Sequence, residues 1–588
     1  MIGRGKISVN SAAEIASSIV SCHTMPNPAI RAFASLGSDT QYGGNIERDL
    51  HRWLRGLYNF KLQSYTIYLM LQVSGKTPKQ TPVKVLLPHE VIDCLATCCP
   101  PYVFSSILLG NLDGEARRGF FEHIKSLQPW HDHPVLCQPG VDFESLIPLA
   151  LHCDGAQFYR DDENFIWSFG SVFGSRGNVK DVLLMKFPLA IIPERFMQDV
   201  EVRREVNNVI AQLVAWSVDL AAKGVAPDVG FYNEPFEKGT YRFSMKGRQL
   251  SSGWRACYIA MKADLKARVY VHNLQRNYQC NLMCDRCLAC QGKDAPDPMN
   301  YKNFSSRKAY DLTTINHDGY VHLDSSSLTP WLSVPGFNME TMMWDLLHNL
   351  YLGTARDFVA SALKTLIQHG CYNFLGETDM DTVLSYVDAR IRKTCSKYKL
   401  GLPAKPQINS NSLKGDDDYA ELSSRFKGSA VKILVWWVAR ETRKQADRFP
   451  DDRIVNILAI CAYHLQRCTE IQDGAGLVLT TGEAEEASNS LQVHLRTYAV
   501  LADHFYKLRI MMFKIRCKGH YLWHTSVEIK LWRLNQNLFH TFQEESFLGK
   551  LKAIGTKCHG RSCCHRLYQR YFLCLAVYLE ECRKVDGE

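Results

Sequence analysis

The stretch that decides the fold is Leu146-Ile147-Pro148-Leu149-Ala150-Leu151-His152-Cys153-Asp154-Gly155. Its short apolar run, closed by a polar turn, predicts a β-strand over 146–153 that stops at Asp154. Two further apolar runs, at 165–173 and 182–192, predict strands joined by a turn rich in Gly and Ser. Together these three segments predict the beginning of a sheet.

The following segments extend this sheet. Residues 194–223 have apolar side chains at helical spacing and lack Pro and Gly until Gly224, so they predict a helix. Strand-like composition returns at 258–271, around Asp264. Three strands, a helix and another strand, with one Asp ending the first strand and one on the last, is the order of an RNase H-like fold. We therefore expect an α+β protein built on an RNase H-like mixed sheet.

A chain of 588 residues is long enough for two to four structural units. Residues 1–140 predict a mainly helical N-terminal region, and 141–280 predict the strands and first helix of the core. Residues 281–530 predict a large helical insertion that also carries metal-ligand motifs. Residues 531–588 predict a C-terminal helical part of the same core.

Composition bounds the class of protein. With 46% hydrophobic and 22% charged residues the chain is globular. Its longest mainly apolar runs, such as Tyr65–Val73, reach at most about half of the roughly 18 residues that a membrane span needs. No secretory signal is recognisable at the N-terminus, so we expect an intracellular protein without a membrane partner. In that setting the 21 cysteines favour reduced thiols, some of them metal ligands.

Positive charge is concentrated late in the chain. The net charge is +9, and 507–570 alone contains 13 Lys and Arg against three acidic residues. Such a segment suits a polyanion, of which nucleic acid is the commonest. An ordinary solvated basic face is the alternative.

Three acids are candidates for phosphodiester chemistry. Two divalent cations roughly 3.5–4 Å apart can activate a nucleophile and stabilise the leaving oxygen, and acids from different elements must converge to hold them. Carboxylates suit Mg²⁺ or Mn²⁺. The candidates are Asp154, Asp264 and Glu545, with Glu544 as an alternative for the third. Because the chain has 60 acidic residues, this choice depends on the motifs around it.

A second set of motifs has the spacing of zinc ligands. Cys284 and Cys287 form a Cys-x-x-Cys, and His520 and His524 form a His-x-x-x-His that shares one face if the segment is helical. Four such ligands predict one structural Zn²⁺. Two rival sets stay open: four local cysteines, with Cys280 and Cys290 joining the pair, and the cluster Cys558-His559-Gly560-Arg561-Ser562-Cys563-Cys564-His565.

These pieces resemble the DDE/D transposases of the CACTA (En/Spm-like) group, and are similar to the wider set that includes the Transib elements and the vertebrate V(D)J recombinase. Asp264 precedes Cys284 by about 20 residues, and His524 precedes Glu545 by a similar distance, as in that group. The stretch 344–353 looks like the Asp-x-x-His-x-x-x-x-Gly signature of the group. The resemblance covers about 140–580.

The resemblance implies a DNA transposase located in the nucleus, if the source is eukaryotic. Asp154, Asp264 and Glu545 would hold two Mg²⁺ or Mn²⁺ ions; water would cleave the transposon end, and the freed 3′ hydroxyl would attack target DNA. Glu545 is preferred to Glu544 because the similar enzymes follow their Glu with a small polar or acidic residue and an aromatic. Asp264 departs from the pattern, since no Gly or Pro stands beside it.

Several points stay open at this stage. Asp345 and His348, from the 344–353 signature, are predicted to be structural and not metal ligands. A catalytically inactive, zinc-stabilised DNA-binding protein derived from a transposase is the alternative to an enzyme. A metal-dependent nuclease without strand transfer would use the same residues. Assembly on DNA as a homodimer or higher oligomer is undecided.

Overall fold

A computed structural model describes residues 9–22, 31, 34–36, 62–73, 77–159, 162–179, 181–323, 328–372, 379–413, 418–558 and 563–586. The chain forms two compact units. The first comprises the described residues of 1–273, 328–341 and 543–588, and the second those of 274–327 and 342–542. Each unit is therefore assembled from segments that are distant in the sequence.

The first unit contains a mixed sheet. Its strands are β1 (Tyr65–Leu71), β2 (Lys79–Val85), β3 (Leu146–Tyr159), β4 (Asp162–Ser171), β5 (Phe187–Pro193) and β6 (Arg255–Ala263). Their spatial order is β1-β2-β5-β4-β3-β6. All neighbours are antiparallel except β3 and β6, which are parallel. The expected combination of α and β structure with a mixed sheet is confirmed.

Strand β3 is longer than its sequence predicts. Every residue from Leu146 to Cys153 is buried, as is typical of a strand with both faces covered. The predicted end at Asp154 is wrong, because β3 continues to Tyr159 in an antiparallel hairpin with β4. The parallel pairing with β6 does stop here, at the pair Cys153 and Ala263. From Asp154 onward β3 keeps one neighbour and has lost the other.

Three other predicted boundaries are corrected by helix caps. The strand predicted at 182–192 begins as the short helix α7 (Val182–Met185), capped by Asp181, and only its second half is β5. The strand predicted at 258–271 ends with β6 at Ala263, and α10 (Leu265–His272) follows. The helix predicted at 194–223 is α8 (Val200–Lys223), which starts later at the cap Asp199. In each case a side-chain cap ends the extended or irregular backbone and starts a helix.

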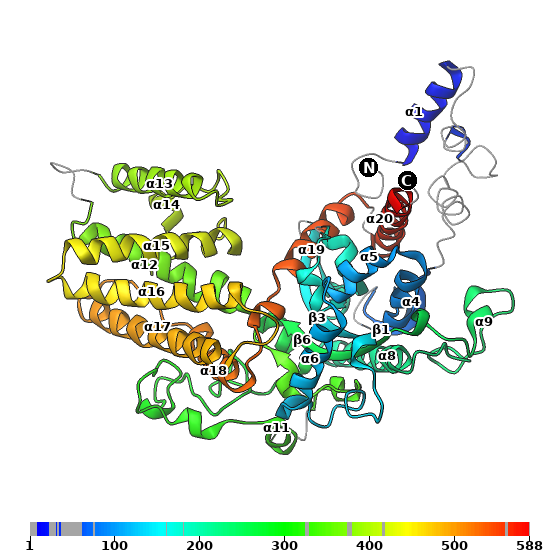
Figure 1. Ribbon diagram of the computed structural model, residues 1–588, viewed down its shortest axis with the longest axis horizontal. Helices are drawn as coiled ribbons and strands as arrows, with labels where there is room; N and C mark the ends of the chain where they lie inside the picture. Colours follow the sequence, from blue (N-terminus) through cyan, green and yellow to red (C-terminus); the bar gives the residue numbers. More distant parts are fainter. Residues whose placement is uncertain are drawn as a thin grey trace. The chain divides into compact units, whose positions relative to one another are not determined.

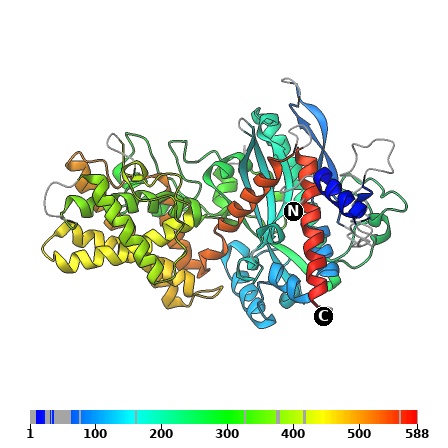
Figure 2. The ribbon, with the colours of Figure 1, turned by 90° about the horizontal axis from the view of Figure 1, so that it is seen from above.

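Helices of the first unit lie before, between and after its strands in the chain, and α8 packs against β1 and β6. They are α1 (Val9–Cys22), α4 (Pro88–Cys98), α5 (Pro101–Phe104), α6 (Gly114–Lys125), α7, α8, α9 (Tyr241–Met245), α10, α19 (Phe542–Gly555) and α20 (Cys563–Asp586). In both ribbon views α19 and α20, orange and red, lie beside the strands (Figures 1 and 2). The Tyr568 hydroxyl of α20 donates to the carbonyl of Leu189 in β5 at 3.0 Å.

The N-terminal region contains helices, as predicted for 1–140, and it also contributes two strands to the sheet. It supplies β1 and β2, which extend the sheet beyond β5. Burial in β1 alternates with a period of two, with Ile67 and Leu69 buried while Tyr68 and Met70 are exposed.

The second unit is mostly helical, as predicted for 340–530. Its regular elements are α11 (His317–Leu323), the two-residue strand β7 (Met342–Met343), the π-helix η12 (Leu347–Thr354), α12 (Ala355–Gln368), α13 (Met380–Lys397), α14 (Ser410–Leu413), α15 (Gly428–Arg448), α16 (Arg453–Gly474), α17 (Thr481–Lys507) and α18 (Cys517–Trp532). Figure 1 shows α15, α16 and α17 lying side by side. Among the described residues, no helix combines the length and apolar character needed to cross a bilayer.

Candidate metal centres

Asp154 and Asp264 occupy matching positions on two neighbouring strands. Cys153 and Ala263 are the last partners of the parallel β3–β6 pair, and the two aspartates are the next residues. The backbone of Asp264 is still extended, so both side chains lie on the same face of the sheet. Burial raises the pKa of the Cys153 thiol well above its usual range, and the charges of Asp154 and Asp264 add to that rise. Both carboxylates therefore lie close to Cys153.

Glu545 joins this edge of the sheet from the first turn of α19, and its predicted helical position is confirmed. Glu545 and Asp154 each offer a carboxylate oxygen, and the two oxygens lie within 4.8 Å of each other. Both residues are half-buried. Acids that are far apart in the sequence are thus neighbours in the first unit.

Asp264 is not part of that close group among the described residues. Its Oδ1 accepts a hydrogen bond from the backbone N–H of Ala267 at 2.6 Å, which makes it the cap of α10. The predicted convergence of three acids is therefore seen for Asp154 and Glu545, while Asp264 stands beside Asp154 in the strand register.

Glu544 has a different role from its neighbour. Its carboxylate is buried and its Oε1 lies 2.8 Å from Nζ of Lys186 and 3.2 Å from Nζ of Lys262, both also buried. Burial opposes ionisation, but the charges of the two lysines, helped by His152, hold the pKa of Glu544 well below its usual range. Glu544 is therefore an ionised partner of two lysines, and Glu545 is the glutamate available beside Asp154.

The second centre belongs entirely to the second unit. Cys284, Cys287, His520 and His524 are all buried, and each offers a ligand atom within 4.8 Å of the others. Sγ of Cys284 is 3.4 Å from Nε2 of His524, and Sγ of Cys287 is 3.3 Å from Nε2 of His520. The two Nε2 atoms are 3.1 Å apart. These four residues could hold one metal ion.

Local structure prepares both halves of this centre. His520 and His524 lie four residues apart on α18, so they share one face of that helix. The backbone N–H of Arg286 donates to Sγ of Cys284 at 3.3 Å, which fixes the turn of the Cys-x-x-Cys. The Tyr521 hydroxyl donates to the carbonyl of Met283 at 2.6 Å and ties α18 to that turn.

The rival ligand sets are not assembled in the described part of the chain. Cys280 and Cys290 are outside the close group, and the thiol of Cys290 donates to a neighbouring carbonyl at 3.4 Å. Among the residues described in the late cluster, Cys558 and Cys563 likewise donate to carbonyls of α19. His559 lies outside the described residues. The geometry selects the two cysteines and two histidines that flank a long stretch of chain.

Asp345 is a structural acid of the second unit. Its carboxylate accepts hydrogen bonds from the backbone N–H groups of Leu347 and Thr541, from the Thr541 hydroxyl at 2.6 Å and from Nδ1 of His348 at 2.5 Å. Burial opposes its ionisation, but these donors, led by His348, lower the pKa of Asp345 to about 2. The prediction of a structural role holds for Asp345, and the role of His348 beyond this contact stays a prediction.

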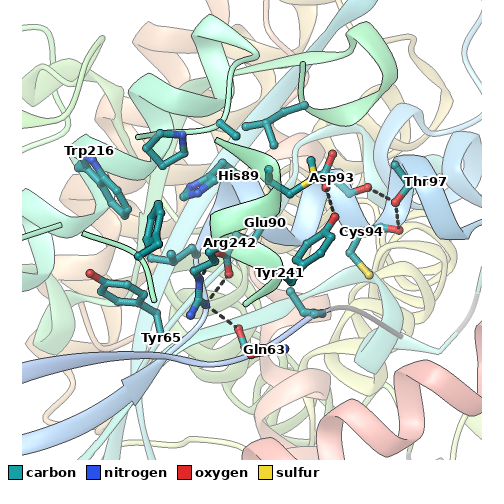
Figure 3. A pocket seen from close by; sticks show the side chains of 17 residues that line it. Gln63, Tyr65, His89, Glu90, Asp93, Cys94, Thr97, Trp216, Tyr241 and Arg242 are labelled. Carbon is teal, nitrogen blue, oxygen red and sulfur yellow. Dashed lines mark hydrogen bonds and ion pairs between the residues drawn. The ribbon is translucent and has the colours of Figure 1, made fainter. Parts of the chain in front are cut away.

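A hollow in the first unit, away from the acids in sequence, has an empty volume of about 670 Å³, part of it open to solvent. Figure 3 shows Arg242 of α9 paired with Glu90 of α4, at 2.5 and 2.8 Å. In the same view the Tyr241 hydroxyl donates to Asp93 at 3.3 Å. These polar groups bind one another and thereby connect α9 to α4. They therefore do not indicate a particular ligand for the hollow.

The two lysines were missed in the sequence. Lys262 is the only charged residue between Ala256 and Ala263, and Lys186 stands alone between Met185 and Phe187. A lone lysine inside an apolar strand run signals a buried partner, since an unpaired buried charge is costly. No model of a known protein family matches the chain, and a search of curated proteins finds no match either.

Proposed function

We propose that this chain is a DNA transposase-like polynucleotidyl transferase that uses Asp154, Asp264 and Glu545 to bind two Mg²⁺ or Mn²⁺ ions. The observation that carries the proposal is the approach of Asp154 and Glu545, within 4.8 Å, at the position where Asp264 enters from the neighbouring strand. The order of β3, β4, β5, α8 and β6 supports the RNase H-like reading of the core.

The residues at this edge fit hard divalent cations. All candidate donors are carboxylate oxygens, which Mg²⁺ prefers, and the half-buried setting of Asp154 and Glu545 leaves room for solvent and substrate. With Oδ1 of Asp264 occupied by the cap of α10, we assign its Oδ2 to the ions. When bound, a pair of such ions supplies an activated water and stabilises the leaving oxygen of a phosphodiester.

The protein itself contributes orientation. Asp154 is held by the β3–β4 ladder, Asp264 by the turn into α10, and Glu545 by the first turn of α19. Three acids on three different elements cannot shift together without disturbing the sheet. We further propose that the basic segment 507–570 binds the DNA backbone, that transposon ends and target DNA are the partners, and that a eukaryotic source places the protein in the nucleus.

For the second unit we propose that Cys284, Cys287, His520 and His524 bind one structural Zn²⁺. Tetrahedral zinc with ordinary bond lengths requires its sulfur and nitrogen ligands to be roughly 3.3–3.6 Å apart. The separations of 3.3 and 3.4 Å between sulfur and nitrogen fit that requirement, and 3.1 Å between the two nitrogens is close to it. Thiolate and imidazole suit zinc, and four protein ligands leave no position for substrate.

Cleavage of supercoiled plasmid in Mg²⁺ or Mn²⁺ tests the proposed chemistry. We expect wild-type protein to nick the plasmid, and Asp154→Asn, Asp264→Asn and Glu545→Gln to lose that activity. Glu201→Gln is the matched control, because Glu201 is an exposed carboxylate in the first turn of α8. Equal nicking by wild type and all three acid variants would overturn the proposal.

A second assay separates transposase from nuclease. A short duplex with a free 3′ hydroxyl, labelled on one strand, is incubated with unlabelled plasmid. Transfer of label to the plasmid that depends on Asp154 is the result expected of a transposase. Nicking without transfer would reduce the proposal to a metal-dependent nuclease, and binding without either reaction would favour the inactive, zinc-stabilised DNA-binding protein.

A further inference from the structure

Charged side chains form two rows on one face of the sheet in the first unit. His152 of β3 is paired in register with Lys262 of β6, and also with Ser168 of β4. Two residues further along, and therefore on the same face, Asp154 and Asp264 form the second row. Two residues of a strand span about 7 Å, so this basic row, which holds the ammonium group of Lys262, lies directly next to an acidic row.

Helix α19 presents one glutamate to each row. Glu544 contacts the basic row, through Lys262 at 3.2 Å and Lys186 at 2.8 Å. Glu545, which points about 100° away around the helix, approaches Asp154 of the acidic row. The chain thus carries two consecutive identical side chains whose surroundings differ completely.

From this arrangement we infer that Lys186, Lys262 and Glu544 form an ionic clamp that fixes the rotation of α19 and thereby selects Glu545 as the metal-binding glutamate. The inference rests on the function proposed for Asp154 and Glu545. The three residues of the clamp are positioning residues, since they contact one another and are not among the proposed metal ligands. Their role is to decide which of two adjacent carboxylates reaches the acidic row.

Backbone structure shows that the clamp is built into the sheet. Lys186 reaches Glu544 by crossing β4 at Gly170, where a Cβ would lie 2.9 Å from Cδ of the lysine and 2.7 Å from the carbonyl oxygen of Met185. The carbonyl of Lys186 accepts a hydrogen bond from the Tyr571 hydroxyl of α20 at 3.2 Å. A glycine in the neighbouring strand and a tyrosine from the last helix therefore hold this lysine in place.

The far end of α19 packs closely against β3. A Cβ on Gly555 would lie 2.6 Å from the ring of Phe158 in β3, so helix and strand are in close contact there. This packing fixes the distance between helix and strand, and the pair of Lys550 with Asp181 at 2.7 Å adds a polar contact of the same helix. Rotation of α19 would leave the buried ammonium groups of Lys186 and Lys262 without their carboxylate, which is strongly unfavourable. The clamp therefore opposes rotation of α19 about its own axis.

The test compares metal binding with folding. The triple variant Lys186→Met, Lys262→Met and Glu544→Met removes all three charges of the clamp. Replacing a buried ionic cluster by apolar residues of similar size often leaves stability unchanged or raised. We expect this variant to melt near the wild-type temperature yet to bind Mn²⁺, measured by calorimetry on zinc-loaded protein, at least about tenfold more weakly. Lys550→Met is the matched control, because it removes the exposed pair of Lys550 with Asp181 from the same helix.

The single variants Lys186→Met and Lys262→Met each retain one lysine beside Glu544, so that the charges of the remaining pair cancel. They test the role of the clamp if the triple variant fails to fold. We expect weaker Mn²⁺ binding in both, and faster amide hydrogen exchange at 543–548 than in Lys550→Met. Wild-type Mn²⁺ affinity and wild-type exchange in folded clamp variants would overturn the inference.

Glu545→Gln separates the two levels of the proposal. If it binds Mn²⁺ as wild type does, the metal assignment fails, and amide exchange in the clamp variants still shows whether the triad holds α19. If Glu545→Gln loses binding while the clamp variants keep it, only the clamp is wrong.

Discussion

The cysteine–histidine centre of the second unit and the acidic centre of the first unit differ in exposure and in donor chemistry. All four residues of the former are buried, whereas Asp154 and Glu545 are half-buried. Soft donors that surround a site completely suit a structural ion, and hard donors at an open edge suit an ion that must meet water and substrate. This difference is the reason why we propose a role in folding for the cysteine–histidine centre and a role in chemistry for the acidic centre.

The two centres also depend on different levels of structure. Each half of the cysteine–histidine centre is local, a turn at Cys284 and Cys287 and one face of α18 at His520 and His524. The acidic centre has no local half, since Asp154 and Asp264 meet only through the register of β3 with β6. The following predictions would break or sharpen this contrast, in order of expected effect.

Loss of the proposed structural zinc has the largest expected effect. Cys284→Ser and His524→Ala should reduce bound zinc from one per chain to none and unfold the second unit, since structural zinc contributes on the order of 10 kcal/mol to folding. Metal analysis and thermal unfolding measure both. Cys290→Ser is the matched control, because Cys290 is nearby and outside the close group. Equal zinc in all variants would refute the site.

Removal of one proposed catalytic acid should affect chemistry alone. For Asp154→Asn we expect plasmid cleavage to fall roughly 100- to 1,000-fold, because positioned metal ions stabilise the transition state by several kcal/mol. Zinc content and melting temperature should match the wild type, which is the reverse of the pattern for Cys284→Ser. Loss of zinc in Asp154→Asn would erase the distinction between the two centres.

Asp345 gives a pH-dependent effect of intermediate size. Its pKa in the folded protein is about 2, below the ordinary 3.8, so its contribution is complete above about pH 4 and is lost as the pH falls through 2. Asp345→Asn should cost roughly 3 kcal/mol at pH 7, because the buried carboxylate accepts several hydrogen bonds. Urea unfolding at pH 7, 5, 4 and 3 should show the difference shrinking only below pH 4; a constant difference would contradict the assignment.

Removal of a helix cap should have the smallest effect on stability. Because each unit contains such a cap, the two units can be compared directly. Thr480 closes a capping box with Glu483 at the start of α17 in the second unit, and Asp199 caps α8 in the first. Asp199→Ala and Thr480→Ala should each cost about 1 kcal/mol. Calorimetry of both variants should show the loss in the unit that carries the cap, with zinc content unchanged. If either cap variant lost more free energy of unfolding than Asp345→Asn, the expected order of effects would be wrong.

Much of the local structure was predictable because it depends on neighbours in the sequence. The end of α8 at Gly224, with φ of 69°, and the helix that carries His520 and His524 follow from residue type and spacing. The continuation of β3 past Asp154 was not predictable, because backbone pairing with β4 outweighs the turn tendency of Asp-Gly. Strand β1 lies within the region predicted to be mainly helical, because a run rich in Tyr, Leu and Met suits either a strand or a helix until a partner strand is known.

By itself the sequence determined which side chains were candidates: three acids, a Cys-x-x-Cys and a His-x-x-x-His, each recognisable by type and spacing. Only the tertiary structure decided between Glu544 and Glu545, because the choice depends on Lys186 and Lys262, which arrive from distant strands. It also decided between the cysteine–histidine set and its rivals, since those ligands meet only when α18 packs on the Cys284 turn. Spacing along the chain limits what a side chain can bind, and packing determines what it meets.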